Sequence, residues 1–184
     1  MSGESGSADR AYRNSDIGAQ LRDWAKRNGR GRAFDSSSEF ILPNGAARSP
    51  DAAWIKRSKL AKLTRQQKRK FGPLSPDFVI EPMPPSDRLK KFQAKMREYI
   101  ENGVMLGWLL DPDKRMAYVY REAREPGRWI GPEQLVAEGP VEGFVLDLKE
   151  ISRPHLNPET GFRYPSPVPR PLTFQSAPRE SGTG

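Results

Sequence analysis

The stretch that decides the fold runs from residue 76 to residue 110 and reads PDFVIEPMPPSDRLKKFQAKMREYIENGVMLGWLL. Its first six residues, 76–81, have a β-branched apolar centre, which predicts a strand. Apolar residues then recur at helical spacing between a Ser-Asp pair and an Asn-Gly pair, which predicts a helix over about 86–101. Residues 104–110 are apolar and predict a buried strand. The stretch therefore predicts a strand, a helix and a second strand in succession.

Further elements are predicted on both sides of this stretch. They are a helix at 14–28 and strands at 32–42, 50–55, 116–120 and 143–148. An Asp-Pro-Asp-Lys turn precedes the strand at 116–120, which predicts a hairpin with the strand before it. This order of elements predicts an α/β fold, with a mixed β-sheet and a helix on each side.

Length and composition set the domain count and exclude several kinds of site. A chain of 184 residues holds one domain of about 140 residues plus tails. Residues 1–11 are rich in Gly and Ser, and residues 153–184 are rich in Pro, so both are expected to be disordered tails around a domain at 12–152. The chain has no cysteine, which excludes thiolate zinc sites and thiol nucleophiles, and its single histidine argues against a Ser-His-Asp triad.

The charge of the chain indicates a polyanionic partner. Lys and Arg number 31 and Asp and Glu 23, so the formal net charge is +8, which favours nucleic acid over other partners. No apolar run approaches 18 residues, so no membrane span is expected and a cytoplasmic protein is the simplest expectation.

Two acidic residues lie in short apolar strands of the predicted sheet. Asp51 follows Pro50, and Glu81 ends the apolar run of residues 78–80. An acid in an apolar strand is costly unless it is paired or binds a cation. On neighbouring strands, two such acids would hold a hard divalent ion such as Mg²⁺, and a water on that ion can attack a phosphodiester. The alternative is that both acids lie at strand ends in solvent.

A lysine in the helix that follows Glu81 extends this constellation. In steps of 100° per residue, Lys95 lies at the edge of the apolar stripe, beside Phe92 and Tyr99. Its ammonium can reach over the sheet towards Glu81, position an attacking water and offset the charge that builds on phosphorus. The alternative is a lysine whose stem covers apolar surface while its head stays in water.

Residues 56–70 hold eight basic residues and no acid. Since this run directly follows the strand of Asp51, it predicts an arm beside the active site that contacts DNA phosphates. The alternative is a solvated amphipathic helix. The DNA contacts are assigned to Lys56, Arg57, Lys59, Lys62 and Arg65, with Lys68, Arg69 and Lys70 in the same run and Arg48 and Arg88 as weaker candidates.

Four segments carry a resemblance to a known family. They are PDAAWI (50–55), PDFVIE (76–81), SDRLKKFQAKMREYIENGVMLGWLLDP (86–112) and AYVYR (117–121). Together they resemble the family called Uma-two, whose members are described as restriction endonucleases and are abundant in cyanobacteria. That family belongs to the PD-(D/E)XK nuclease superfamily. The resemblance covers about residues 13–151, and its helix–Gly–strand–Asp-Pro pattern at 95–112 is specific.

This resemblance implies a restriction-endonuclease-like mixed sheet and an Mg²⁺- or Mn²⁺-dependent DNA endonuclease. Asp51 matches the aspartate of the PD motif, and Glu81 matches the second acidic metal ligand. Met83 stands where the motif lysine is expected, and Lys95 matches the lysine that the family carries in the following helix. The other candidates are Gln93 and Tyr99, which would flank the site, and Asp77, held in reserve for Asp51.

Three departures from the family pattern support a rival interpretation. The family carries about 30–40 further N-terminal residues, so the chain is expected to be N-terminally short. Pro82 follows Glu81 within the strand, where proline removes a hydrogen-bond donor, and Pro84 replaces a serine. The rivals are an inactive nuclease-fold protein that binds DNA and a truncated product that does not fold stably. A homodimer is also expected, because cutting both strands of a duplex commonly uses two sites.

Overall fold

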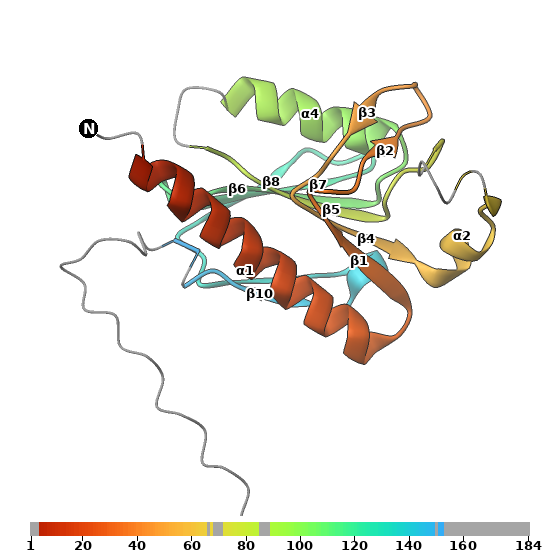
Figure 1. Cartoon of the computed structure of the whole chain (residues 1–184). Coiled ribbons are helices and arrows are strands. Elements are labelled where there is room, and N and C mark those ends of the chain that lie inside the picture. The colour runs from red at the N-terminus through yellow and green to blue at the C-terminus, as the bar shows by residue number, and fades with distance from the viewer. Residues whose placement is uncertain (1–3, 66, 68–71, 85–88, 150, 153–184) are drawn as a thin grey trace, which may run out of the picture.

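The computed structural model describes residues 4–65, 67, 72–84, 89–149 and 151–152 (Figure 1). Its centre is a six-stranded mixed sheet in the order β1-β4-β5-β6-β7-β8. The strands are β1 (Gly31–Asp35), β4 (Ala52–Lys56), β5 (Phe78–Pro82), β6 (Leu106–Asp111), β7 (Met116–Arg121) and β8 (Gly127–Ile130). Strands β5 and β6 are parallel, and every other neighbouring pair in this sheet is antiparallel.

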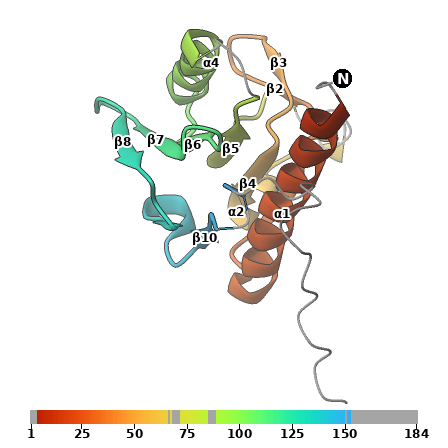
Figure 2. The ribbon, with the colours of Figure 1, turned by 90° about the vertical axis from the view of Figure 1, so that its left-hand side faces the viewer.

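Two long helices lie on opposite sides of the sheet (Figure 2). One side carries α1 (Glu4–Asn28) and the small antiparallel sheet of β9 (Gln134–Val136) and β10 (Val145–Asp147). The other side carries α4 (Leu89–Glu101) and the hairpin of β2 (Phe40–Ile41) and β3 (Ala47–Arg48). The remaining elements are the short helix α2 (Arg57–Ala61) and the 3₁₀ turn η1 (Gly139–Val141). The predicted α/β fold is therefore confirmed.

No helix in the described part of the chain is both long enough and apolar enough to cross a membrane.

Each side of the sheet has its own apolar core. Under α1 the core is aromatic: Trp24 lies 5.9 Å from Trp54, and Trp108 stacks on Phe144 at 5.8 Å between ring centroids. Trp54, Trp108 and Phe144 are each about 1% exposed and belong to this core.

Under α4 a glycine in β6 lies against the helix. A Cβ on Gly107 would lie 2.5 Å from the Cε atom of Met96, so a larger residue there would require the flexible end of the Met96 side chain to shift. Close packing of α4 matters for the site, because this helix carries Lys95 and Tyr99 over the end of β5.

The structure corrects the prediction of a disordered tail over residues 1–11. Helix α1 begins at Glu4, ten residues before the predicted start at Asn14, so residues 4–11 are helical. Its first turns lack the apolar spacing by which an amphipathic helix is recognised. Arg13, which is 8% exposed, forms an ion pair with Asp113 at 3.4 Å and ties this end of α1 to the β6–β7 turn.

Strand boundaries also differ from the prediction. The run at 32–42 is divided between β1 and β2, with a turn between them. Strands β8 and β9 were not predicted, because β8 shows no apolar alternation and leaves Trp129 and Ile130 exposed. The strand expected at 143–148 is confirmed as β10. The Pro-rich segment at 153–184 lies outside the described residues.

Pro82 ends β5 without breaking its pairing with β6. The amide of Met83 donates to Leu110 O at 2.7 Å, so the β5–β6 ladder continues past the proline. Backbone groups of successive residues point to opposite neighbours, so the nitrogen of Pro82 faces the β4 side. Strand β4 begins only at Ala52, opposite Ile80, and offers no ladder bond there. The missing donor therefore costs the sheet nothing at this position.

Candidate active site

The antiparallel pairing of β4 and β5 brings Asp51 and Glu81 together. Ala52 lies opposite Ile80 in this antiparallel pair. Asp51, which precedes Ala52, therefore meets Glu81, which follows Ile80, across the two strands. Each carboxyl group is among those that shift the pKa of the other, which reflects their proximity. The two acids predicted from separate strands thus form one cluster.

Burial makes this cluster electrostatically unfavourable. Glu81 is 1% exposed, and burial, opposed by Lys95 and reinforced by Asp51, raises its pKa to about 7. Burial also raises the pKa of Asp51, and the positive charge of Arg10 is the largest opposing influence. A buried and a half-buried carboxyl group with raised pKa values in one place are typical of a functional site.

Helix α4 supplies the groups that hold Glu81. Nζ of Lys95 lies 2.6 Å from Glu81 Oε1, and the hydroxyl of Tyr99 donates to the same oxygen at 2.9 Å. Positions 95 and 99 are four residues apart, so both side chains project from one face of the helix. The ammonium also lies 5.8 Å from the centroid of the Tyr99 ring. The structure thus brings Lys95 to Glu81, as its helical phase predicts.

Asn14 of α1 completes the surroundings of Asp51. Its Nδ2 donates to Asp51 Oδ1 at 2.5 Å. Its own Oδ1 is buried and finds no hydrogen-bond partner among the described residues. An orphaned amide oxygen beside two carboxylates is a donor set of hard oxygens, which fits Mg²⁺ or Mn²⁺.

In the described part of the chain, no three Asp, Glu, His or Cys side chains lie close enough together to hold a metal ion jointly. With two carboxylates alone, an Mg²⁺ ion keeps several of its waters.

The two carboxylates open into a cleft of about 760 Å³, called here the carboxylate cleft. A second hollow of about 650 Å³ adjoins it and shares Ser49, Phe92 and Lys95 with it. The carboxylate cleft is lined by Arg10, Ala11, Asn14, Ser15, Asp35, Ser36, Ser37, Ser49, Asp51, Glu81, Phe92 and Lys95.

The remaining reserve residues, Asp77 and Gln93, do not line the carboxylate cleft. Asp77 is at the opposite end of β5 from Glu81, four residues or about 13 Å along the strand. It accepts a hydrogen bond from the backbone amide of Lys56 at 2.8 Å and pairs with Lys59 at 3.3 Å. Gln93 lies on α4 but is not among the residues that line the carboxylate cleft.

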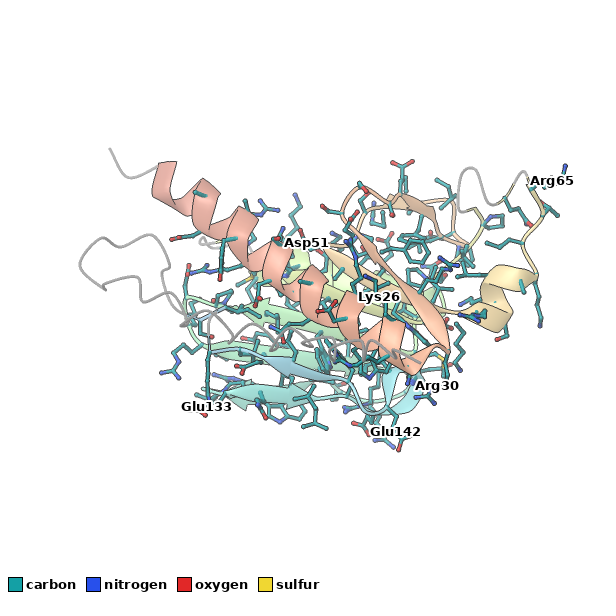
Figure 3. All side chains as sticks on the ribbon, turned by 60° about the horizontal axis from the view of Figure 1, so that its bottom comes forward. Lys26, Arg30, Asp51, Arg65, Glu133 and Glu142 are labelled. Atoms are coloured by element: carbon teal, nitrogen blue, oxygen red, sulfur yellow. The ribbon has the colours of Figure 1, made fainter. Side chains whose placement is uncertain are left out.

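The structure contradicts the placement of the basic run beside the active site. Lys56 ends β4 and Arg57 begins α2, at the opposite end of β4 from Asp51 and roughly 20 Å along the chain. Arg65 lies far from Asp51 in Figure 3. The physical reason is that β4 itself carries the chain away from the carboxylates. Four of the basic candidates, Lys68, Arg69, Lys70 and Arg88, lie outside the described residues.

Sequence reasoning missed Arg10 and Asn14. Arg10 lies in the segment that was expected to be a tail, and Asn14 is the first residue of the predicted helix. Their spacing of four residues places them on one helix face, but this signal is readable only once the helix is known to extend that far.

The comparisons with known proteins agree with this architecture. A family model described as "Uma2: Putative restriction endonuclease" matches residues 1–149. No sequence among the curated proteins matches this chain. Among solved structures, a crystal structure of a "putative nuclease belonging to DUF820" from Anabaena variabilis ATCC 29413 is similar, with a TM-score of 0.64 and 20% sequence identity. That match covers 78% of this chain and 80% of the other, and at this identity it shows the fold.

The family match spans most of the chain, the neighbour has the same fold, and the residues that suggested the resemblance lie within the matched region. The chain therefore belongs to the Uma2 family of restriction-endonuclease-like proteins.

Proposed function

We propose that this protein is a nuclease that hydrolyses phosphodiester bonds of DNA with the help of Mg²⁺ or Mn²⁺. The observation that carries the proposal is the meeting of Asp51 and Glu81 in the carboxylate cleft, with the Lys95 ammonium 2.6 Å from Glu81. Membership of a nuclease family supports the reaction type. A homodimer, expected from the two strands of a duplex, stays a prediction.

Asp51 and Glu81 are the proposed metal ligands, and Asn14, whose Oδ1 is buried without a hydrogen-bond partner among the described residues, lines the same cleft. A bound divalent ion supplies a water of lowered pKa and a Lewis acid for the phosphate. The hydrogen bond from Asn14 Nδ2 fixes the rotamer of Asp51, as a supporting group around a metal ligand does.

Lys95 is the proposed positioning group for the attacking water. Its side chain is 27% exposed and lines the carboxylate cleft, and its ammonium contacts the buried Glu81 carboxylate. There it can orient a water and stabilise negative charge that develops on the phosphate. Arg10 at the cleft contributes a positive charge that attracts the DNA backbone.

The rival is a nuclease-fold protein that binds DNA without cutting it. Pro82 motivates this rival, but the continued β5–β6 pairing through Met83 leaves the strand intact around Glu81. Salt-dependent DNA binding without metal-dependent cleavage would select it.

The test is cleavage of supercoiled plasmid in Mg²⁺ or Mn²⁺ by the wild type, Lys95→Met and Lys90→Met. Both lysines lie on α4, but Lys90 is exposed and lies outside the carboxylate cleft, so the two variants lose the same charge from the same helix. Lys95→Met is expected to cleave about 10²–10³-fold more slowly, as when one electrostatic group of an active site is removed. Lys90→Met is expected to stay within about threefold of the wild type.

Folding of each variant is checked by circular dichroism. Equal rates for Lys95→Met and the wild type would remove Lys95 from the mechanism. Absence of cleavage by the folded wild type in either metal would overturn the nuclease proposal in favour of the inactive rival.

A further inference from the structure

A separate hollow, of about 460 Å³, lies at the other end of β1 from the carboxylate cleft. We call it the basic groove, because four cationic side chains from three elements line it and no acidic residue does. Its lining is Arg22, Ala25, Lys26 and Gly29 from α1 and the turn after it, Gly31, Arg32, Ala33 and Phe34 from β1, and Arg57 from α2.

Three of the four cations that line the basic groove have no acidic partner among the described residues. Among the described residues, Lys26, Arg32 and Arg57 form no ion pair, and all three are exposed. Arg22 pairs with Asp35 at 3.2 Å, where both side chains are about half exposed. Like charges brought together from separate elements repel one another, and an anion in the groove relieves that repulsion.

Another hollow of similar size shows that this charge pattern is not general on the molecule. It measures about 470 Å³ and is lined by three arginines, Arg97, Arg121 and Arg124. Its lining also contains Glu101 and Glu125, which offset most of that positive charge. Of these two hollows, only the basic groove has no acidic residue in its lining to balance its positive charge, so an external anion would stabilise it.

Strand β1 connects the basic groove to the carboxylate cleft. Its last residue, Asp35, lines the cleft, and residues 31–34 line the basic groove. The strand spans about 13 Å from Gly31 to Asp35. Arg22 lines the groove and pairs with Asp35 of the cleft, so it stands between the two sites.

We infer that the basic groove binds backbone phosphates of the same DNA strand whose scissile bond enters the carboxylate cleft. The inference rests on the proposed function and adds the path of the substrate: along β1, from the two carboxylates to Arg22, Lys26, Arg32 and Arg57. A polyanion with regularly spaced phosphates can occupy both sites, because they are a few nucleotides apart. Within the predicted basic run, Arg57 has this role, whereas Lys59 pairs with Asp77.

The experiment measures binding of a labelled DNA duplex by fluorescence anisotropy, with EDTA present, at about 50 to 200 mM NaCl. The variant is Arg32→Gln/Arg57→Gln. The matched control is Arg124→Gln/Arg128→Gln, which removes the same two charges from exposed arginines outside the groove. Losing two phosphate contacts is expected to reduce the slope of log K against log salt by about two and to weaken binding on the order of tenfold at low salt. The control is expected to bind like the wild type.

A third variant, Arg32→Lys/Arg57→Lys, keeps both charges and is expected to retain the wild-type slope. Equal slopes of log K against log salt for Arg32→Gln/Arg57→Gln and its control would overturn the inference. The plasmid cleavage assay tests the proposed function independently of this result. Binding that depends on Arg32 and Arg57, together with an absence of cleavage, would support the groove and overturn the nuclease. An absence of any DNA binding by the wild type would overturn the inference.

Discussion

At the scale of single residues, the Tyr99 hydroxyl favours the charged form of Glu81, together with the larger effect of Lys95. It donates to the Glu81 oxygen that also faces Lys95, and this hydrogen bond lowers the pKa of the carboxyl against the effect of burial. Tyr99→Phe removes the donor and keeps the ring. The pKa of Glu81 should therefore rise further, and the acidic limb of the cleavage profile should move to higher pH by about one unit, since a hydrogen bond to a charged group contributes about 1.5–3 kcal/mol.

The measurement is the rate of plasmid cleavage against pH. Tyr118→Phe serves as the control, because the Tyr118 hydroxyl faces Met116 Sδ at 4.0 Å and not the carboxylates. If the profiles of Tyr99→Phe and the wild type coincide, the hydroxyl has no part in setting the charge of Glu81.

Residue patterns predicted the acids and the lysine but not their whole surroundings. Asp51 and Glu81 stand out because acids in apolar strands are rare, and Lys95 stands out by its helical phase. Asn14 offers no such signal, because its role depends on α1 crossing the end of β4, and that contact is not local in sequence. The pairing of Asp77 with Lys59 could not be predicted from the sequence either, because this contact also joins segments that are not neighbours in the chain.

At the scale of elements, the end of β5 decides whether proline interferes with the site. The nitrogen of Pro82 faces away from β6, and Met83 maintains the ladder to Leu110. Pro82→Val is therefore expected to change cleavage by no more than about threefold and the free energy of unfolding by less than about 1 kcal/mol. Plasmid cleavage and urea denaturation measure these two effects. A gain of tenfold or more in cleavage would show that the proline distorts the wild-type site.

Elements with strong periodicity were predicted well, and weakly patterned ones were not. Helix α4 and strands β5, β6 and β7 follow clear apolar spacing. The first turns of α1 are polar, and β8 leaves most of its side chains exposed, so neither carries the apolar pattern by which a helix or strand is predicted from sequence.

At the scale of the whole molecule, the carboxylates lower stability at neutral and alkaline pH. The pKa of Glu81 is about 7 in the folded protein and 4.5 in its ordinary state. Between these values the unfolded chain has released the proton that the folded protein still holds, so the free energy of unfolding falls as pH rises. The contribution of protonated Glu81 is fully present below pH 4.5 and lost above about pH 7. It amounts to about 3 kcal/mol.

Glu81→Gln removes this pH-dependent loss. The variant without metal is expected to be more stable than the wild type at pH 8 by about 1–3 kcal/mol, with Lys95 partly hydrated in place of its lost partner. At pH 4 no gain is expected, because Glu81 is already neutral. Urea denaturation at the two pH values measures the difference, with the exposed Glu101→Gln as control. A variant that is less stable than the wild type at pH 8 would contradict this account.

The path of the chain through the whole sheet was beyond sequence reasoning. The strand order β1-β4-β5-β6-β7-β8 is set by pairings between segments far apart in the chain. It places the basic run at the far end of β4, although Lys56 lies five residues after Asp51 in sequence. The same order brings Arg57 beside α1 and β1, where the basic groove forms.

The central claim is that Asp51 and Glu81 form a divalent-ion site. The most direct test is isothermal titration calorimetry of Mn²⁺ binding at pH 8. One Mn²⁺ site per chain is expected in the wild type and in the control variant Asp77→Asn. In the wild type the Asp77 carboxylate binds Lys56 and Lys59 at the other end of β5 from Glu81. Asp51→Asn should weaken binding by at least about tenfold, since it removes a charged ligand. Unchanged Mn²⁺ binding by folded Asp51→Asn, or its loss in folded Asp77→Asn alone, would contradict the account.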